Sequence, residues 1–459
     1  MLNSYDSYQS SELPWIKQIP CHWQYLRNRN ILIENKMKVG EKSDTYQLLS
    51  LTKQGVIVRD ISSGKGKFPS SFDSYKIVMP GNIVFCLFDV EETPRTVGIS
   101  HDHGMITGAY NVFEIRNMIN PDYLCFYYIA FDNIKAFKSL YTGLRNVIKM
   151  PTFMSTKIPF PPRDEQDQIV RFLDWKTSEM AHFIKEKRRQ IELLIELKNS
   201  LICTVVLHGP HRTANKRDSS VEWIQTIPAH WSEITLFQCA TEQNLSNKSV
   251  RHQNLLSLSY GKIVNKDINT AEGLLPSSFD TYQIVHDGNV ILRLTDLQND
   301  HKSLRVGLST QTGIITSAYT CLKARDNILP EYLYYLLHAY DVSKVFYGMG
   351  GGVRQSIGYA DIRRMVIPLP PLDEQQEIVD YCREQQAKIE QMIAGIKDEI
   401  ALVQELRTKT ISDVVTGKVN VRDVEIPQYE PEADDSIDEE ENDENSYEDN
   451  SEAADEEVE

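Results

Sequence analysis

Two copies of one motif mark the places where this chain changes from a globular pattern to a helical one. Ile158-Pro-Phe-Pro-Pro-Arg-Asp-Glu-Gln166 returns 209 positions later as Ile367-Pro-Leu-Pro-Pro-Leu-Asp-Glu-Gln375. We call it the closing motif. A proline pair cannot continue a strand and suits the approach to a helix, so each copy predicts that a helix follows. Asp164 and Asp373 are expected to be the N-caps of these helices.

The repetition extends well beyond the closing motif. Trp15-Ile-Lys-Gln-Ile-Pro-Cys-His-Trp23, the opening motif, recurs as Trp223-Ile-Gln-Thr-Ile-Pro-Ala-His-Trp231 at an offset of 208. Shorter blocks, such as Gly104-Met-Ile-Thr-Gly-Ala-Tyr110 and Gly313-Ile-Ile-Thr-Ser-Ala-Tyr319, recur in the same order. A constant order with a nearly constant offset indicates a tandem duplication of a unit of about 210 residues.

Each unit divides into a globular part and a helical part, so the predicted fold class is α+β. Residues 1–163 and 210–372 mix short β-like runs with Gly, Ser and Pro turns and one aromatic helical stretch. Residues 164–209 and 373–420 carry apolar residues at the 3.5-residue spacing of a coiled coil. We expect the two long helices to pack antiparallel on each other. Residues 421–459 are predicted to be an acidic, disordered tail.

Charge and cysteine usage place limits on the class of protein. The net charge of −16 comes from the tail, because residues 427–459 hold 17 Asp and Glu and no Lys or Arg. The seven cysteines are scattered without a CxxC pair, so the sequence predicts neither a disulfide framework nor a zinc site. We predict no signal peptide and find no apolar run long enough to span a membrane, and we expect the protein in the cytoplasm.

A search for catalytic motifs is negative. The sequence has no phosphate loop, no glycine-rich dinucleotide turn, no HExxH and no GxSxG. It also lacks the Asn-Pro-Pro-aromatic or Asp-Pro-Pro-aromatic tetrapeptide of amino-methylating enzymes. The paired acids Asp164–Glu165 and Asp373–Glu374 are interpreted as helix-start residues that favour the helix dipole. We therefore predict no catalytic and no metal-binding residues.

The opening and closing motifs, repeated in one order, resemble the specificity subunits of type I restriction-modification systems over residues 11–420. The resemblance implies that residues 1–163 and 210–372 are target recognition domains, each reading one half of a bipartite asymmetric DNA target. It implies that the two helices are a spacer on which two methyltransferase subunits dock, with an endonuclease subunit as a further partner. S-adenosylmethionine would then belong to the methyltransferase, ATP and Mg to the nuclease, and no cofactor to this chain.

Matched loops supply the candidate DNA contacts. Gly143-Leu-Arg-Asn146 and Gly352-Val-Arg-Gln355 combine a glycine, which permits close backbone approach, with side chains that read guanine, phosphate or adenine. Further candidates for phosphate contact are basic residues in or beside turns. The predicted DNA-binding residues are Arg145, Asn146, Arg354, Gln355, Lys65, Lys67, Arg95, Arg305 and Lys149.

Other interpretations remain open at this point. The chain could be the recognition subunit of a methylation-only or other defence system, or a coiled-coil adaptor that does not bind DNA. A stand-alone enzyme is disfavoured by the missing motifs. The acidic tail is either a solubilising extension or a competitor of DNA phosphates for a basic groove.

Overall fold

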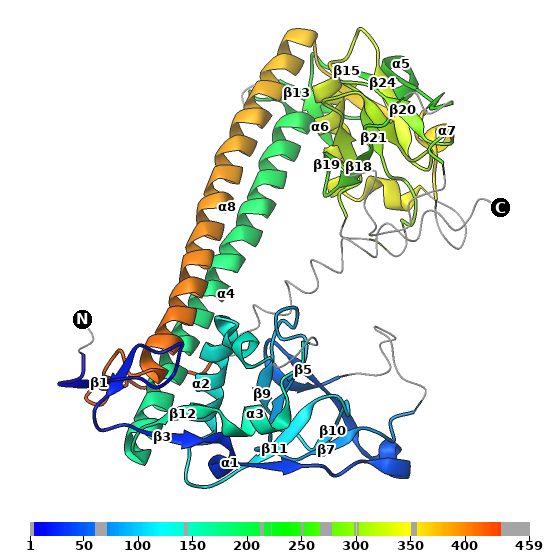
Figure 1. Ribbon diagram of the computed structural model, residues 1–459. Coiled ribbons are helices and arrows are strands. Elements are labelled where there is room, and N and C mark those ends of the chain that lie inside the picture. Colours follow the sequence, from blue (N-terminus) through cyan, green and yellow to red (C-terminus); the bar gives the residue numbers. More distant parts are fainter. Residues whose placement is uncertain are drawn as a thin grey trace. The chain divides into compact units, whose positions relative to one another are not determined.

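The computed structural model describes residues 4–59, 71–141, 146–211, 215–221, 223–248, 252–266, 278–297, 300, 303–349 and 356–432. The chain divides into two compact units, and the division cuts both long helices (Figure 1). Unit 1 consists of Met1–Arg188 with Lys397–Glu441, and the described part of unit 2 lies within Arg189–Ile396. Each unit therefore takes its helical part from both halves of the sequence.

Unit 1 contains the first globular domain. One sheet has the order β4-β11-β8-β9 and a second has the order β6-β5-β10-β7, while β1 pairs with β2 and β3 with β12. The strands are β1 (Tyr8–Ser10), β2 (Gln18–Pro20), β3 (Gln24–Arg27), β4 (Leu32–Asn35), β5 (Gln47–Thr52), β6 (Gly55–Val58), β7 (Lys76–Val78), β8 (Ile83–Phe85), β9 (Val97–Ile99), β10 (Gly104–Ile106), β11 (Asn111–Ile115) and β12 (Lys157–Phe160). The helices are α1 (Asn28–Ile31), α2 (Pro121–Asn133) and α3 (Met150–Ser155), with 3₁₀ turns η1 (Gly40–Thr45) and η2 (Ala136–Leu140).

Unit 2 repeats this plan. The order β16-β24-β21-β22 matches β4-β11-β8-β9, and the second sheet is divided into β17-β20-β23 and β18-β19, linked by a bridge between Leu255 and Ile314. Its strands are β13 (Lys216–Asp218), β14 (Thr226–Pro228), β15 (Ser232–Thr235), β16 (Ala240–Glu242), β17 (Leu245–Ser246), β18 (Leu256–Ser259), β19 (Lys262–Asn265), β20 (Gln283–Val285), β21 (Val290–Leu292), β22 (Val306–Leu308), β23 (Gly313–Ile315), β24 (Thr320–Ala324) and β25 (Val366–Leu369). Helices α5 (Leu236–Cys239), α6 (Pro330–Val342) and α7 (Tyr359–Ile362) and the 3₁₀ turn η3 (Val345–Gly348) complete it.

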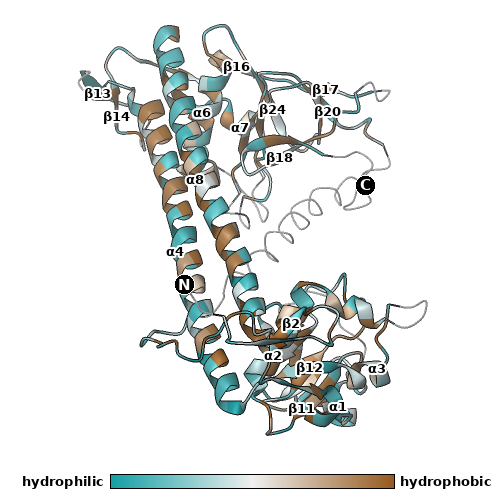
Figure 2. Cartoon of the chain, turned by 60° about the vertical axis from the view of Figure 1, so that its left-hand side comes forward, coloured by the Kyte–Doolittle hydropathy of each residue, from teal (hydrophilic) through white to brown (hydrophobic). Residues whose placement is uncertain are grey.

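The long helices α4 (Arg163–His208) and α8 (Leu372–Val415) run in opposite directions. In unit 1 the start of α4, with Ile169 and Leu173, shares a core with Ile411 and Val414 near the end of α8. In unit 2 the end of α4 shares a core with the start of α8, where Ile378 and Cys382 lie. This reciprocal pairing confirms the predicted antiparallel coiled coil. Figure 2 shows hydrophobic and hydrophilic residues interleaved along both helices, as the 3.5-residue spacing requires.

The two motifs that define the repeat are in contact with each other. In unit 1 the carboxylate of Glu165 accepts hydrogen bonds from Tyr5 (2.6 Å) and Trp23 Nε1 (3.0 Å) and lies 2.7 Å from His22 Nε2. In unit 2 the carboxylate of Glu374 lies 2.6 Å from His230 Nε2. The opening motif is thus fixed to the first turn of the long helix in both repeats.

The helix starts differ from the prediction. The helices begin at Arg163 and Leu372, so Asp164 and Asp373 lie in the first turn and are not N-caps. The neighbouring Gln166 fixes the first turn instead. Its side-chain oxygen accepts from the backbone N–H of Asn120, and its Nε2 donates to the carbonyl of Pro161. Gln375 repeats both contacts with Leu329 and Pro370.

The end of each long helix packs against the globular domain of the other repeat. Tyr123 donates a hydrogen bond to the carbonyl of Pro159 (3.2 Å) and approaches that of Val415 (3.5 Å). Tyr332 contacts Pro368 and Val206 in the same way. Each globular domain is therefore completed by a helix that the other repeat contributes.

Candidate nucleic-acid interface

The predicted DNA-reading loops return to the domain on equivalent backbone anchors. In unit 1 the N–H of Ile148 donates to Leu87 (2.8 Å), and Val147 forms a bridge with Phe88. In unit 2 the N–H of Ile357 donates to Leu294 (3.0 Å). The turns that follow these acceptors contain Asp89 and Asp296, both with positive φ (43° and 54°). The same scaffold therefore supports both loops, whatever side chains they carry.

Within the first loop, Asn146 and Lys149 are described and are exposed. The carbonyl of Asn146 accepts from the N–H of Asp89 (2.8 Å), which fixes its backbone and leaves its side chain at the surface. Lys149 directly precedes the first turn of α3. The predicted contacts Arg145, Arg354, Gln355, Lys65 and Lys67 lie outside the described residues.

The predicted contacts Arg95 and Arg305 do not occupy equivalent positions in the two repeats. The N–H of Cys86 donates to Thr96, and the equivalent N–H of Arg293 donates to Arg305. Likewise the N–H groups of Thr96 and Arg305 donate to Asp132 and Asp341. Arg305 is therefore the counterpart of Thr96, and Arg95 is the counterpart of Leu304.

A shift of one residue along a strand reverses the side-chain direction, and the two arginines differ accordingly. Arg305 is fully buried (0% exposed), and its guanidinium donates to Tyr347 and to the carbonyls of Arg293, Thr295, Asp296 and Asp300. It holds a loop together, which corrects its assignment as a phosphate contact. The Arg95 side chain is 16% exposed and donates to Asn133 (3.1 Å).

Sequence reasoning missed a cluster of three lysines in unit 1. Lys36 and Lys38 are exposed after β4, and Lys38 forms a backbone bridge with the half-buried Lys76 on β7. Burial lowers the pKa of Lys76, Glu34 opposes this shift, and the charges of Lys36 and Lys38 lower the pKa further. Lys36 and Lys38 thus lie near enough to Lys76 for their charges to lower its pKa. We call them the lysine cluster.

The second repeat carries uncharged residues at the same positions. Strand pairing aligns Met37 with Leu245 and Ile77 with Ile284, so the counterparts of the lysine cluster are Asn244, Ser246 and Gln283. Gln283 donates to the carbonyl of Tyr319 (2.5 Å), as Lys76 does to that of Tyr110 (2.5 Å). Sequence reasoning could have found this difference by comparing charge between the aligned repeats, because Lys36-Met-Lys38 corresponds to Asn244-Leu-Ser246.

Within the described ranges, no group of three or more His, Cys, Asp or Glu side chains could hold a metal ion. No described helix is long and apolar enough to cross a membrane. All seven cysteines fall in the described part of the chain and are free thiols. The polar side chains of the site are suited to binding an anionic surface with directional hydrogen bonds.

Comparison with known proteins agrees with this geometry. The model of the type I restriction modification DNA specificity domain matches residues 105–193 and 306–402, one match in each repeat. Each repeat therefore contains a segment that matches this family, and the resemblance stated from the sequence is confirmed.

Individual relatives are specificity subunits that match along most of their length. The putative type I restriction enzyme MjaX specificity subunit of Methanocaldococcus jannaschii is 25% identical over 441 residues, which cover 89% of this chain and 96% of that protein. The MjaVIII specificity subunit of the same organism is 22% identical and covers 70% and 76%. A chain from a structure on complex assembly and conformational transition of the type I R-M system shares the fold, with a TM-score of 0.58 at 15% identity, covering 87% and 99%.

Proposed function

We propose that each unit reads one half of a split, asymmetric DNA target, while α4 and α8 set the spacing and dock the methyltransferase subunits. The observation that carries this proposal is a shared scaffold with a different surface. The loop anchors at Ile148 and Ile357 are equivalent, whereas the lysine cluster has only neutral counterparts. Two domains of one fold with unlike surfaces suit two unlike half-sites.

Phosphate contacts and base contacts would divide between two regions of unit 1. Lysines position a protein on the DNA backbone without reading sequence, whereas Asn side chains pair with adenine edges. The lysine cluster and Lys149 fit the first role, and the exposed Asn146 fits the second. Arg145, Arg354 and Gln355 remain candidates for base reading in the two loops.

The helices offer apolar surface for partner subunits. Exposed apolar residues gathered on one pair of helices favour a protein interface. We assign this surface to the methyltransferase subunits, which would bring S-adenosylmethionine; an endonuclease subunit would bring ATP and Mg. The exposed apolar residues on α4 or α8 are Phe183, Leu402 and Leu406 in unit 1 and Leu193, Ile195, Leu197, Leu372 and Met392 in unit 2.

The test is to co-express the chain with its methyltransferase and to map N6-methyladenine on genomic DNA. A split motif with two unlike halves and a fixed unspecified spacer is expected. Exchange of residues 1–163 for those of a relative should change one half only. A short uninterrupted motif would contradict the two-reader proposal, and a stable complex without any methylation would favour the adaptor. Cleavage of unmethylated DNA that requires ATP would reveal the endonuclease partner.

A second variant addresses the lysine cluster. K36N/K38S/K76Q gives the first repeat the residues of the second and should weaken DNA binding by the assembled complex for all sequences alike. The slope of log affinity against log salt should fall by roughly one for each phosphate that the variant no longer neutralises. K17Q, which removes an exposed lysine between β1 and β2, is the control. If K36N/K38S/K76Q and K17Q changed DNA binding equally, the lysine cluster would not be part of the DNA interface.

A further inference from the structure

In unit 1 the chain that follows α8 returns along α4. Gln168 Nε2 donates to the carbonyls of Val421 (3.0 Å) and Val424 (2.8 Å). Further along α4, the N–H of Glu432 donates to Ser178 Oγ (2.7 Å), and this hydroxyl donates to the carbonyl at position 430 (3.2 Å). We call residues 421–432 the strap. It runs in the same direction as α4 and covers the stripe of the helix that these contacts mark.

The two ends of the strap are held in different ways. Near its start, Val421 is buried in the core of unit 1 and Ile426 packs against that core. At its far end, the Glu432 carboxylate lies 2.6 Å from Lys185 Nζ and 3.8 Å from His182 Nδ1. Ion pairs at a surface are weak because water and salt screen them. The far end can therefore leave α4 while the start of the strap stays in the core.

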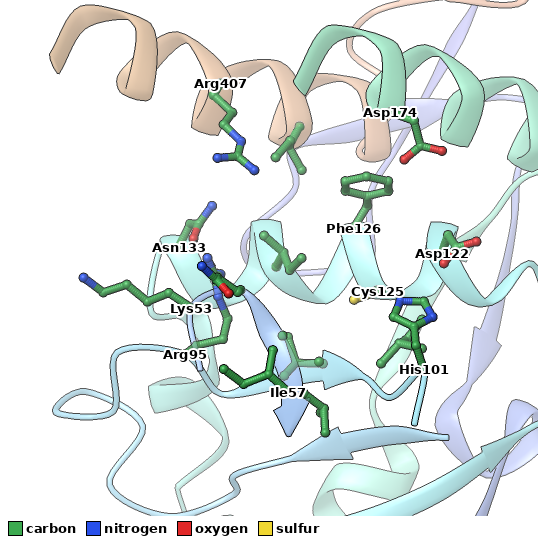
Figure 3. A pocket seen from close by; sticks show the side chains of 18 of the residues that line it. Lys53, Ile57, Arg95, His101, Asp122, Cys125, Phe126, Asn133, Asp174 and Arg407 are labelled. Carbon is green, nitrogen blue, oxygen red and sulfur yellow. Dashed lines mark hydrogen bonds between the residues drawn. The ribbon is translucent and has the colours of Figure 1, made fainter. Parts of the chain in front are cut away.

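The far end of the strap also borders a cavity of about 1290 Å³ between the globular domain and α8. Pro431 and Glu432 belong to its lining, and Figure 3 shows Asp174 of α4 and Asp122 of α2 at one end of it. Burial, and after it the charge of Asp174, raises the pKa of Tyr429, so Tyr429 lies near this part of α4. The strap therefore follows α4 between its two anchored ends.

The α4 side chains that hold the strap are not repeated in α8. They are Gln168, Ser178, His182 and Lys185, and at the repeat offset of 209 their counterparts are Glu377, Ala387, Gln391 and Ala394. The two alanines have no group that could bond the backbone of a strap or pair with its carboxylate. The strap site is thus encoded by side chains in which the two long helices differ.

Burial differs between the two helices at the same positions. Gln168 and Ser178 are 9% and 7% exposed, whereas their counterparts Glu377 and Ala387 are exposed. In unit 2 the chain that follows α4 reaches Glu377 through His211 (Nε2–Oε2 3.3 Å) and then enters β13. The two long helices therefore present unequal surfaces at equivalent positions.

An apolar residue of the proposed docking surface lies beside the strap. Phe183 directly follows His182, which contacts Glu432, and Phe183 is 39% exposed. Its counterpart Met392 on α8 is 55% exposed. Two copies of one subunit bind through the same surface, so they require equivalent surfaces on the two units. In unit 1 such a copy would meet the far end of the strap.

We propose that the strap competes with a methyltransferase subunit for α4, so that the two docking sites of this chain are unequal. The first subunit binds to unit 2, and the second displaces residues 427–432 from unit 1. This inference rests on the proposed docking of methyltransferase subunits on the long helices. A strap that is closed about nine-tenths of the time lowers the apparent affinity of its competitor about tenfold.

The test titrates the methyltransferase into this chain and measures both binding steps by isothermal titration calorimetry, with mass photometry to count the bound subunits. S178A/K185A in the full-length chain gives α4 the residues of α8 and should strengthen the weaker step about tenfold. Truncation after Ile426 should have the same effect, and combining the two changes should add little, because both remove one contact. Truncation after Glu432 keeps the strap and should leave the weaker step weak.

Two control variants accompany this experiment. E186Q, next to Lys185 on α4, should change neither step, and M392Q on α8 should weaken only the step that the strap variants leave unchanged. Truncation after Ile426 keeps the residues that pack in the core, and thermal unfolding checks that it folds.

Three results would contradict the inference. Unchanged binding in both S178A/K185A and the chain truncated after Ile426 would show that the strap does not compete. Weaker binding by that truncated chain would make the strap a part of the docking surface. If none of the chains, wild type included, bound a methyltransferase subunit, the proposed docking would fail and this inference with it.

Discussion

Glu165 joins the opening motif to the long helix through side chains that the sequence separates by more than a hundred residues. Its side chain is only 4% exposed, and its carboxylate is the hydrogen-bond partner of Tyr5, His22 and Trp23. Burial and the hydrogen bond to Glu165 raise the pKa of Tyr5, so its hydroxyl stays protonated and donates. In unit 2, Trp231 Nε1 is buried without a partner among the described residues, and the carboxylate of Glu374 is shared by fewer groups.

Glu165→Gln should therefore destabilise the protein more than Glu374→Gln. The amide removes a charged acceptor from buried donors, for which a loss of about 1–3 kcal/mol is typical. Glu374→Gln should cost about 1 kcal/mol or less, because His230 is half exposed and can bond water. Urea unfolding of the two variants measures both values. Equal losses would show that the additional donors in unit 1 contribute nothing.

At the same scale, the sequence already shows that Arg95 and Arg305 are not equivalent. Arg305 directly precedes Val306-Gly-Leu-Ser309, whereas Thr96 separates Arg95 from Val97-Gly-Ile-Ser100, so at the common offset of 209 Arg305 aligns with Thr96. Backbone hydrogen bonds agree with this alignment, and it matters because a shift of one residue exchanges the interior for the surface. The same bonds reveal that the lysine cluster has neutral counterparts.

The helix ends are decided by glycines in the left-handed region. Gly209 (φ 78°) and Gly417 (φ 74°) follow α4 and α8 and lie against the opening motif of the other repeat. A Cβ on Gly417 would lie 2.4 Å from Pro20 Cδ and 3.1 Å from Trp23, whereas on Gly209 its nearest neighbour is 3.2 Å away. The end of α8 thus tolerates no side chain.

Gly417→Ala should lower the free energy of unfolding by more than Gly209→Ala. The positive φ alone costs about 1 kcal/mol in either variant, and in Gly417→Ala the clash with the proline ring adds to it. Thermal unfolding of both variants tests the order. If Gly209→Ala proved the more damaging, the packing of α8 on the opening motif would not be as tight as these distances indicate.

Helix α6 contains a buried histidine that makes stability depend on pH. Burial lowers the pKa of His338 to about 4, and its Nδ1 has no partner among the described residues. The unfolded chain takes up this proton near the ordinary value of 6.5, so stability falls as pH decreases from 6.5 to about 4. Asp341, whose pKa burial raises to about 6, acts in the opposite sense over an overlapping range.

His338→Gln should therefore weaken the loss of stability in acid. Between about pH 7 and about pH 4.5, the drop in unfolding free energy should shrink by a few kcal/mol relative to the wild type. Urea unfolding at both pH values gives the difference directly and is independent of any constant cost of the substitution. His252→Gln, which alters a histidine on a loop before β18, is the control. If His338→Gln left the loss of stability in acid unchanged, His338 would be protonated in the folded protein.

At the scale of the whole molecule, the exposed apolar residues of the long helices are the feature that favours binding to a partner subunit. The seam residues Ile169, Leu173 and Ile184 are buried, while Leu402 and Leu406 are 64% and 52% exposed. Leucines so exposed on a helix add little to the stability of this chain alone. They can contribute when a partner covers them.

Leu402→Gln with Leu406→Gln should weaken assembly with the methyltransferase by about tenfold or more, since burial of each leucine is worth about 1.5–3 kcal/mol. Thermal stability of the isolated chain should change little, because glutamine is a good helix former. Leu245→Gln, at a similarly exposed position on β17, is the control. Assembly can be measured by mass photometry or analytical ultracentrifugation. Undiminished assembly would place the docking surface elsewhere.

The sequence by itself determined the duplication, the α+β class, the position of both long helices and their antiparallel seam. These features are periodic or repeated, and each copy of a motif repeats the same local requirement for a turn, a helix start or an apolar face. The tertiary structure alone decided that Glu165 serves three donors, that Arg305 is internal and that each helix completes the domain of the other repeat. Such contacts join residues far apart in the sequence, and one residue of register changes them, so no local pattern encodes them.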